Sequence, residues 1–421
     1  MWRALLLLII SSSAWGQTQE TIILNEGELE IPITRFEAFA DDAPILLWLP
    51  SARGISNKQS ITATALGDSD IETWIIDLHL AYFVDAGRSS VKEFNPADIA
   101  KLIIIAAKRT NNKIYLMATG RVAKLSLEAI ALVQQQAEKN NNDLRVGGLI
   151  LFHPFLTLPT STPGTRAQFL PIAQNSTIPI YYIQPSISTR QWRSREAIDM
   201  LQANGSAVFY HAMPGIAAGY HLRPDEDMSD LDFAQRAKLP TDIKNAIDLL
   251  SSQNDFSAPK VVEPISFTTV NKLYGLNPLS KRAALPLTLD DATASPVTID
   301  YSSQKVTLVS FWASWCGPCI KELPSLRHLY DDYHDKGLQI VTVNVGETPT
   351  DVQKTIQEFS MQDYINLFDP QGSEMKTWNV YGFPTNFLIN AKGELPFASF
   401  GGVEWDDKQV RDIIDSLLAL E

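Results

Sequence analysis

The two cysteines of the chain, Cys316 and Cys319, are separated by only two residues and lie between an apolar run at 306–311 and a helix-forming segment. This pattern predicts a strand that ends where a helix begins. A disulfide that closes so short a loop adds little stability, and a zinc site needs two more Cys or His ligands at suitable spacing. His328 and His334 follow without a second paired motif. We interpret the pair as a redox centre, with a structural disulfide and a zinc site as alternatives.

The start of a helix suits a reactive cysteine. The unpaired N–H groups and the partial positive charge at the helix N-terminus favour the thiolate form of Cys316. This thiolate is then the nucleophile that attacks a partner disulfide. Cys319, one turn later, resolves the mixed disulfide. Between them, Gly317 would let a partner chain approach closely, and Pro318 removes a backbone N–H donor where the first helical turn can spare one. We therefore predict Cys316 and Cys319 as catalytic, with Trp315, Gly317 and Pro318 in contact with the substrate.

The N-terminus has the composition of a secretory signal peptide. Residues 1–16 combine Arg3, an apolar run at 4–10, and the small residues Ala14 and Gly16, which predicts cleavage after Gly16. An uncleaved membrane anchor is the alternative, but the run is far shorter than the roughly 20 residues of a spanning helix. We expect a periplasmic protein. An exported protein that relied on disulfides for stability would spread its cysteines, so this pair again indicates chemistry.

Length and charge set further bounds. With 421 residues the chain exceeds one ordinary domain. We predict one domain at 17–252, a proline-containing linker at 253–282 and a second domain at 283–421. The 35 Lys and Arg against 48 Asp and Glu give a net charge of -13, which argues against nucleic acid as a partner.

The first domain alternates strand and helix patterns, which predicts an α/β domain with a mainly parallel sheet and helices on both faces. A hairpin is expected at 21–24 and 29–34. The predicted strands are 45–49, 73–78, 113–118, 148–153, 178–183 and 207–212, with helices at 97–107 and 121–136.

The order of strand and helix patterns in the second domain predicts a mixed sheet covered by helices. A leading hairpin is expected at 285–289 and 297–301. The further strands are 306–311, 339–345, 385–389 and 398–400, and the helices are 320–335, 352–359 and 408–419.

The run Val306-Thr-Leu-Val-Ser-Phe-Trp-Ala-Ser-Trp-Cys-Gly-Pro-Cys-Ile-Lys-Glu-Leu-Pro324 resembles the TlpA/ResA-type branch of the thioredoxin superfamily, over roughly the last third of the chain. The resemblance implies a thioredoxin fold and a thiol-disulfide oxidoreductase. Val380-Tyr381-Gly382-Phe383-Pro384-Thr385 is the second matching element. In this family the proline that matches Pro384 is cis and faces the redox pair, and the backbone of Phe383 would hold substrate.

Thioredoxin itself has a buried aspartate in the strand before the motif, where this chain has Ser310. The resemblance instead implies a glutamate after the next strand. Glu347 is therefore the candidate acid or base for proton transfer to and from Cys319. A solvated loop carboxylate is the alternative for Glu347.

The resemblance also suggests the direction of the reaction and its partners. It favours a reductase of protein disulfides that is kept reduced by a membrane-bound electron donor, and it suggests cytochrome c maturation as a role. We expect no cofactor and no metal. A redox-controlled binding protein or metallochaperone is an alternative.

The first domain resembles an α/β-hydrolase in strand order. The strand-to-helix turn at 116–123 would present the nucleophile, but Gly120 occupies that position. Gln184-Pro185-Ser186 offers no carboxylate, and His221 resembles the remnant of a histidine loop. We expect a catalytically inactive domain that recognises a partner or positions the redox domain, with residual hydrolase activity as the alternative.

Overall fold

The computed structural model describes residues 11–13, 17–24, 28–87, 89–140, 145–158, 164, 166, 168–253, 275–280 and 282–419. They form two compact units, one from residues 1–157 and 169–264 and the other from 158–168 and 265–421. The predicted signal peptide lies outside the described residues except for Ser11–Ser13, which forms a short strand. Most of the predicted linker lies outside them as well.

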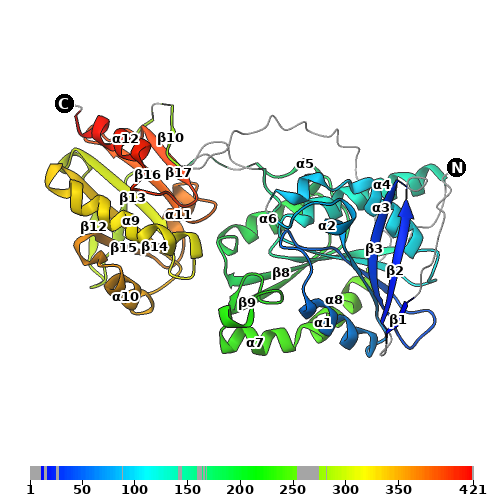
Figure 1. Ribbon diagram of the computed structural model, residues 1–421. Coiled ribbons are helices and arrows are strands. Elements are labelled where there is room, and N and C mark those ends of the chain that lie inside the picture. The colour runs from blue at the N-terminus through cyan, green and yellow to red at the C-terminus, as the bar shows by residue number, and fades with distance from the viewer. Residues whose placement is uncertain are drawn as a thin grey trace. The chain divides into compact units, whose positions relative to one another are not determined.

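The N-terminal unit is built on a mainly parallel sheet with the strand order β1-β2-β3-β5-β4-β6-β7-β8-β9 (Figure 1). The strands β4 to β9 pair in parallel, whereas β1, β2 and β3 form an antiparallel edge that joins β5. The strands are β1 (Ser11–Ser13), β2 (Gln17–Leu24), β3 (Leu29–Phe36), β4 (Ile45–Trp48), β5 (Glu72–Ile76), β6 (Ile114–Thr119), β7 (Val146–Phe152), β8 (Ile180–Ile187) and β9 (Val208–Ala217).

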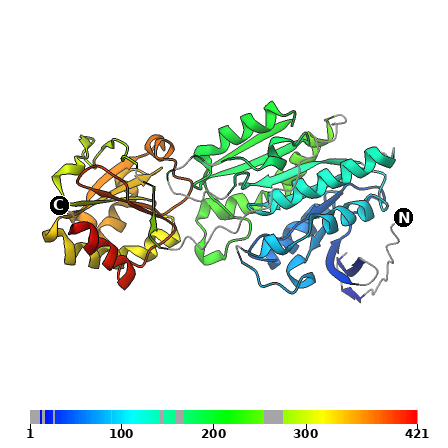
Figure 2. The same ribbon diagram turned by 90° about the horizontal axis from the view of Figure 1, so that it is seen from above.

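Helices cover both faces of this sheet. The helices α1 and α8 pack on one face, where Leu66 and Ile243 join the core formed with Trp48 and Phe152. On the other face α3 and α4 lie side by side (Figures 1 and 2). The helices are α1 (Asn57–Gly67), α2 (Leu78–Ala81), α3 (Pro96–Ala106), α4 (Val122–Asn140), α5 (Pro171–Gln174), α6 (Ser194–Ala203), α7 (Asp230–Ala237) and α8 (Leu239–Ser251).

The apolar runs in the sequence become the central strands because both of their faces are covered. Every residue of β4, β6 and β7 is buried, as expected for a continuous apolar strand in a parallel sheet. The predicted hairpin is also present, since Leu24 pairs with Leu29 in an antiparallel register.

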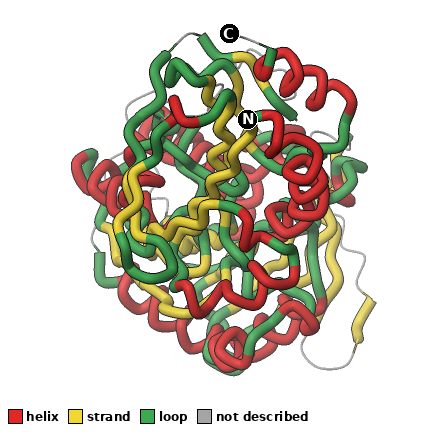
Figure 3. Tube along the Cα trace, turned by 90° about the vertical axis from the view of Figure 1, so that its left-hand side faces the viewer, coloured by secondary structure: helices red, strands yellow, loops and turns green. Residues whose placement is uncertain are grey.

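The C-terminal unit contains a mixed sheet in the order β10-β17-β16-β13-β14-β15-β11-β12. The strand β13 pairs in parallel with β14 and antiparallel with β16. Figure 3 distinguishes helices, strands and loops by colour. The strands are β10 (Asn277–Pro278), β11 (Thr288–Asp290), β12 (Pro296–Thr298), β13 (Val306–Trp312), β14 (Leu338–Val345), β15 (Ile365–Asp369), β16 (Thr385–Asn390) and β17 (Phe397–Phe400), and the helices are α9 (Gly317–Tyr333), α10 (Pro349–Glu358), α11 (Ser373–Thr377) and α12 (Lys408–Leu418).

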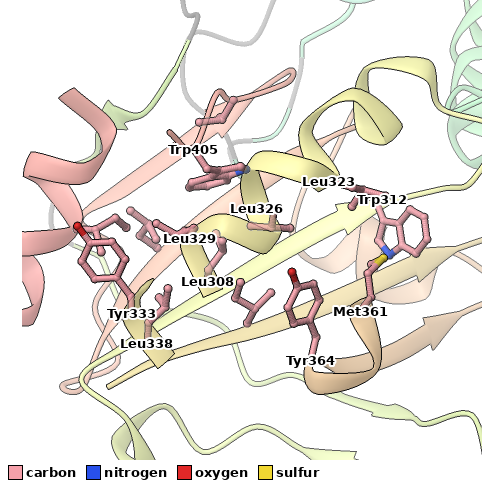
Figure 4. Packing of buried hydrophobic residues seen from close by; sticks show 14 of the residues in the cluster. Leu308, Trp312, Leu323, Leu326, Leu329, Tyr333, Leu338, Met361, Tyr364 and Trp405 are labelled. Carbon is pink, nitrogen blue, oxygen red and sulfur yellow. The ribbon is translucent and has the colours of Figure 1, made fainter. Parts of the chain in front are cut away.

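The core of this unit lies between the sheet and α9, α10 and α12. Leu326 and Leu329 of α9 lie over Leu308 of β13 (Figure 4). On the opposite face of the sheet, Phe311 and Phe387 contact Trp378, which directly follows α11. The packing of α9 on β13 thus fixes the position at which this helix begins.

Two strands of the C-terminal unit were not among the predicted strands. The strand β15 was not predicted, because Asn366 interrupts its short apolar run; its side chain is used in hydrogen bonds with Thr342 Oγ1 and the Met361 carbonyl. The strand β10 falls within the segment predicted as linker and pairs with β17 at the edge of the C-terminal sheet.

A membrane-spanning helix would need a long apolar segment, and no helix in the described part of the chain has the necessary length and apolarity.

The substitution Leu326→Ala should lower the free energy of unfolding of the C-terminal unit by about 2–5 kcal/mol, because it removes a 1% exposed side chain from the core. Both cysteines lie in this unit, so labelling of Cys319 in reduced protein by a thiol reagent during urea unfolding reports on this unit alone. The control is Leu285→Ala at a 39% exposed position. Equal midpoints for the two variants would show that this packing does not hold the unit together.

Candidate active site

Cys316 occupies the N-cap position of α9, and its Sγ forms a disulfide with Cys319. The Cys319 N–H donates to Cys316 Sγ over 3.3 Å, and the Ile320 N–H donates to the Cys316 carbonyl over 3.1 Å. In the reduced protein the same N–H group and the helix dipole would stabilise a Cys316 thiolate. Cys316 is 7% exposed and Cys319 is 1% exposed, so a partner reaches Cys316 first.

The loop before β16 lies beside the two cysteines. The Phe383–Pro384 peptide bond is cis, which confirms the isomer that the resemblance implied. The rings of Trp315 and Phe383 lie 5.8 Å apart between centroids, and both pack against the core cluster that contains the cysteines. Gly317 and Pro318 are exposed. The structure therefore brings the predicted substrate-contacting aromatic residues together at the start of α9.

The surface beside Gly317 is open. Apart from its chain neighbours and the backbone of its own helix, no described heavy atom lies within 4 Å of the position that a Cβ on Gly317 would occupy. A partner backbone can therefore approach the cysteine pair from this side.

Glu347 follows β14 and is half-buried. Its Oε2 accepts hydrogen bonds from the Ser314 N–H and from Asn344 Nδ2, each over 2.8 Å. Its Oε1 accepts a hydrogen bond from the Ser314 hydroxyl. Among the described residues, Glu347 makes no hydrogen bond with either cysteine. Its contacts hold the segment that leads into Cys316.

A second carboxyl group, that of Glu322, lies on α9 one turn beyond Cys319. It is 3% exposed. Its Oε2 accepts a hydrogen bond from the Val403 N–H over 2.9 Å, and its Oε1 accepts one from Asn386 Nδ2 over 3.4 Å. Burial raises the pKa of Glu322 to about 8, against the opposing effect of these two hydrogen bonds. Glu322 can therefore hold a proton at neutral pH.

In the sequence, Glu322 stands out only as one residue of the run that resembles the TlpA/ResA branch. The available signal was its spacing, since a residue three positions after Cys319 lies on the same helix face and enters the same core. Ser310, at the position of the thioredoxin aspartate, is 2% exposed and carries no carboxyl group.

In the N-terminal unit, the turn after β6 has Gly120 at its tip with φ of 60°, a conformation that favours glycine. Thr119 Oγ1 and His221 Nε2 lie 3.1 Å apart, and both side chains are buried. Burial lowers the pKa of His221 to about 3, so its ring is neutral at neutral pH. The position predicted for a nucleophile therefore offers no side chain next to this histidine.

The fold and the cysteine pair define the C-terminal unit as a redoxin domain. Residues 278–414 match the Redoxin family. The match begins at Pro278, the second residue of β10.

The relatives of this region are thiol-disulfide oxidoreductases. The thiol-disulfide oxidoreductase ResA of Geobacillus kaustophilus is 38% identical over 96 residues, which cover 23% of this chain and 54% of the relative. The sporulation thiol-disulfide oxidoreductase A of Bacillus subtilis is 33% identical over 108 residues, which cover 25% and 64% of the two chains. The chain thus spans about half to two thirds of the length of these relatives.

Solved structures also align with about a third of the chain. A putative thiol:disulfide interchange protein DsbE from Chlorobium tepidum is 28% identical and is covered over its whole length, with 34% of this chain aligned and a TM-score of 0.31.

The raised pKa of Glu322 predicts a specific dependence of stability on pH. The stability that the protonated carboxyl provides is fully present below the ordinary pKa of 4.5 and is lost as the pH rises through about 8. Over this window the wild-type protein should lose stability on the order of a few kcal/mol relative to Glu322→Gln. Urea unfolding of reduced protein at a series of pH values, followed by labelling of Cys319, measures the difference.

The matched control for this experiment is Glu358→Gln, which makes the same chemical change at an exposed position of α10. It should follow the wild-type pH profile. If Glu322→Gln follows that profile as well, the buried carboxyl does not carry the proton that we describe.

Proposed function

We propose that the protein is an extracytoplasmic thiol-disulfide oxidoreductase of the TlpA/ResA type that reduces disulfides in partner proteins. The observation that carries this proposal is the placement of Cys316 at the N-cap of α9, in front of the more deeply buried Cys319. The redoxin match and the named relatives support it.

The reaction begins with the reduced cysteine pair. The Cys316 thiolate attacks one sulfur of the partner disulfide, whose S–S bond breaks while a mixed disulfide with Cys316 forms. The released partner thiolate takes up a proton. Cys319 then loses its proton and attacks Cys316 Sγ, which releases the second partner thiol. Two electrons pass to the partner, and the Cys316–Cys319 disulfide seen in the structure remains.

The proton of Cys319 needs an acceptor in the second step. Glu322 lies in the same buried layer one turn away, and a carboxyl with a pKa of about 8 can exchange a proton near neutral pH. Glu347 is the candidate from the sequence, and its hydrogen bonds to Ser314 place it beside the segment before Cys316. We propose that Glu322 exchanges the proton and that Glu347 positions this segment.

The next cycle needs a donor of two electrons to reduce the Cys316–Cys319 disulfide again. We propose a membrane-bound donor and a periplasmic location, on the basis of the signal-like N-terminus and the resemblance to the TlpA/ResA branch. A role in cytochrome c maturation follows from the same resemblance.

For the N-terminal unit we propose a degenerate α/β-hydrolase-like domain without hydrolase activity. The mainly parallel sheet and the glycine at the tip of the β6–α4 turn support this proposal. Without a nucleophile at Gly120, the neutral His221 has no side chain to activate at that position. The domain would then serve to recognise a partner or to position the redox domain.

Replacement of either cysteine should separate the two steps of the reaction. Cys316→Ser should abolish reduction of a protein disulfide, because it removes the nucleophile. Cys319→Ser should instead accumulate the mixed disulfide, because the resolving thiol is absent. Non-reducing mass spectrometry with reduced enzyme and oxidised insulin distinguishes the variants. Reduction of insulin by Cys316→Ser at the wild-type rate would rule out the assignment.

The two carboxylates should differ in their effect on the second step. In Glu322→Gln, a preformed mixed disulfide should be resolved about 10²-fold more slowly, which is the lower end of the usual range for general acid-base catalysis. The rate of resolution in the wild type should rise with pH near pH 8, and this rise should be absent in Glu322→Gln. Glu347→Gln should keep the pH profile. Stopped-flow measurement of partner thiol release provides the rates. If the pH dependence of the rate is lost in Glu347→Gln and kept in Glu322→Gln, then Glu347 and not Glu322 exchanges the proton.

A further inference from the structure

A row of polar side chains crosses the C-terminal sheet beneath α9. Asn386 of β16 lies directly opposite Ser310 of β13 and opposite Ser399 of β17. Residues that lie opposite each other on neighbouring strands project from the same face of a sheet. Leu308 and Leu388, two positions away along the same strands, belong to the core cluster that includes the buried side chains of α9. The polar row therefore lies on the face of the sheet that α9 covers.

The row lies where polar groups destabilise a fold unless they are paired. Asn386 and Ser399 are both 0% exposed. A buried amide needs its hydrogen bonds satisfied, whereas an apolar side chain of similar size, such as leucine, would fill the same space without this requirement. The next residues of β16, Phe387 and Leu388, are apolar and equally buried. An amide at position 386 thus requires a polar partner in the core.

That partner is the carboxyl group of Glu322 on α9. Asn386 Nδ2 donates a hydrogen bond to Ser399 Oγ over 3.1 Å and one to Glu322 Oε1 over 3.4 Å. The Val403 N–H donates to the other carboxyl oxygen, Oε2, over 2.9 Å. Ser399 therefore holds the amide in an orientation that faces Glu322. The carboxyl group is fixed between β16 and the segment that follows β17.

The carboxyl group of Glu322 needs different partners in its two protonation states. The carboxylate only accepts hydrogen bonds, and N–H groups of Asn386 and Val403 supply them. The protonated carboxyl carries an O–H group, which needs an acceptor. The backbone N–H of Val403 is a donor only, so it cannot serve the protonated state.

Asn386 carries such an acceptor. Its Oδ1 is buried and has no hydrogen-bond partner among the described residues. Oδ1 and Nδ2 exchange places when the amide turns over about its Cβ–Cγ bond, and the two ends of an amide have nearly the same shape. Oδ1 then faces Glu322 and Ser399, whose O–H groups can both donate to it. The amide can therefore bond to Glu322 in either protonation state.

We infer that Asn386 is a positioning residue for Glu322, which bonds to the carboxyl group in both protonation states and keeps it in place while a proton passes to and from Cys319. In the resolving step, Cys319 Sγ gives its proton to the Glu322 carboxylate and attacks Cys316 Sγ. The partner sulfur leaves as a thiolate with the electron pair of the broken S–S bond. The inference rests on the proton exchange proposed above and adds a residue of β16 to it.

The charges around Glu322 allow the contribution of Asn386 to be measured separately. Burial raises the pKa of Glu322, and the charge of Glu404, which follows β17, raises it further. The Cys319 thiol is the titratable group one turn away on α9. Asn386 and Ser399 on the strands below are uncharged. A substitution of Asn386 by leucine therefore changes the hydrogen bonds of Glu322 and not the charge around it.

The pH dependence of mixed-disulfide resolution in the full chain tests the inference. The mixed disulfide is formed at about pH 5, where Glu322 is protonated, and release of the partner thiol is followed by stopped flow after a jump to each higher pH. In Asn386→Leu the carboxylate loses a charge-assisted bond, which is the stronger of the two bonds that Asn386 can offer. The rate at neutral pH should fall about tenfold below the wild-type rate, and the rise of the rate should move to higher pH.

The control is Thr342→Val, which removes a buried hydroxyl group from the same row. Thr342 of β14 lies opposite Ser310, is 2% exposed and donates to Asn366 Oδ1 over 2.7 Å. This variant should keep the pH at which the wild-type rate rises. If Asn386→Leu keeps it as well, while Glu322→Gln loses the rise, the inference alone is wrong. If Glu322→Gln also follows the wild-type profile, the proton exchange is wrong and the inference is overturned with it.

A second measurement uses the wild-type protein in its disulfide form, in which neither cysteine titrates, so that it does not depend on how a variant folds. The side-chain carboxyl carbon of Glu322 and the side-chain amide of Asn386 are followed by NMR as the pH is raised. Both sets of signals should change with the same midpoint, at a pH of about 8.

The reference signal in this titration is the amide of Asn366, which donates to the backbone carbonyls of Met361 and Tyr364 and should stay constant. Amide signals of Asn386 that stay as constant as those of Asn366 while Glu322 titrates would overturn the inference and leave the proton exchange standing. A Glu322 signal that does not change in this range would overturn both.

Discussion

The packing of α9 on β13 is the constraint on which the redox site depends. β13 lies between β14 and β16 and is buried at every position, so it cannot shift without exposing apolar surface. Leu326 and Leu329 attach α9 to this strand, and each fully buried leucine contributes about 1.5–3 kcal/mol. The strand therefore ends at Trp312 and the helix begins at Gly317, which leaves Cys316 at the helix cap.

The same packing gives two carboxyl groups different surroundings. Glu322 follows Cys319 on the buried face of α9 and enters the core, where desolvation favours its protonated form. Glu347 lies outside the core cluster, where it accepts hydrogen bonds from Ser314 and Asn344. Burial on one helix thus separates a carboxyl with a raised pKa from a carboxyl that accepts hydrogen bonds from the loop before Cys316.

Local sequence patterns were sufficient for the cysteine pair and for the strand and helix around it, because each depends on neighbouring residues. The cis proline of the loop before β16 was expected only from the family resemblance. The environment of Glu322 was not predictable in this way. It depends on Asn386 and Val403, which lie 64 and 81 positions away and meet Glu322 only in the folded unit. In the N-terminal unit, Phe155 and Arg190 likewise lie far apart in the sequence and meet only in the folded chain.

The reduction potential of the Cys316–Cys319 pair tests the central claim most directly. Purified protein would be equilibrated with thiol buffers of defined potential, and the ratio of dithiol to disulfide would be determined by mass spectrometry after the free thiols are blocked. A reductase supplied by a membrane donor should have a potential near or below that of thioredoxin, about -270 mV. A potential near about -120 mV would identify an oxidant of folding proteins and would contradict the account.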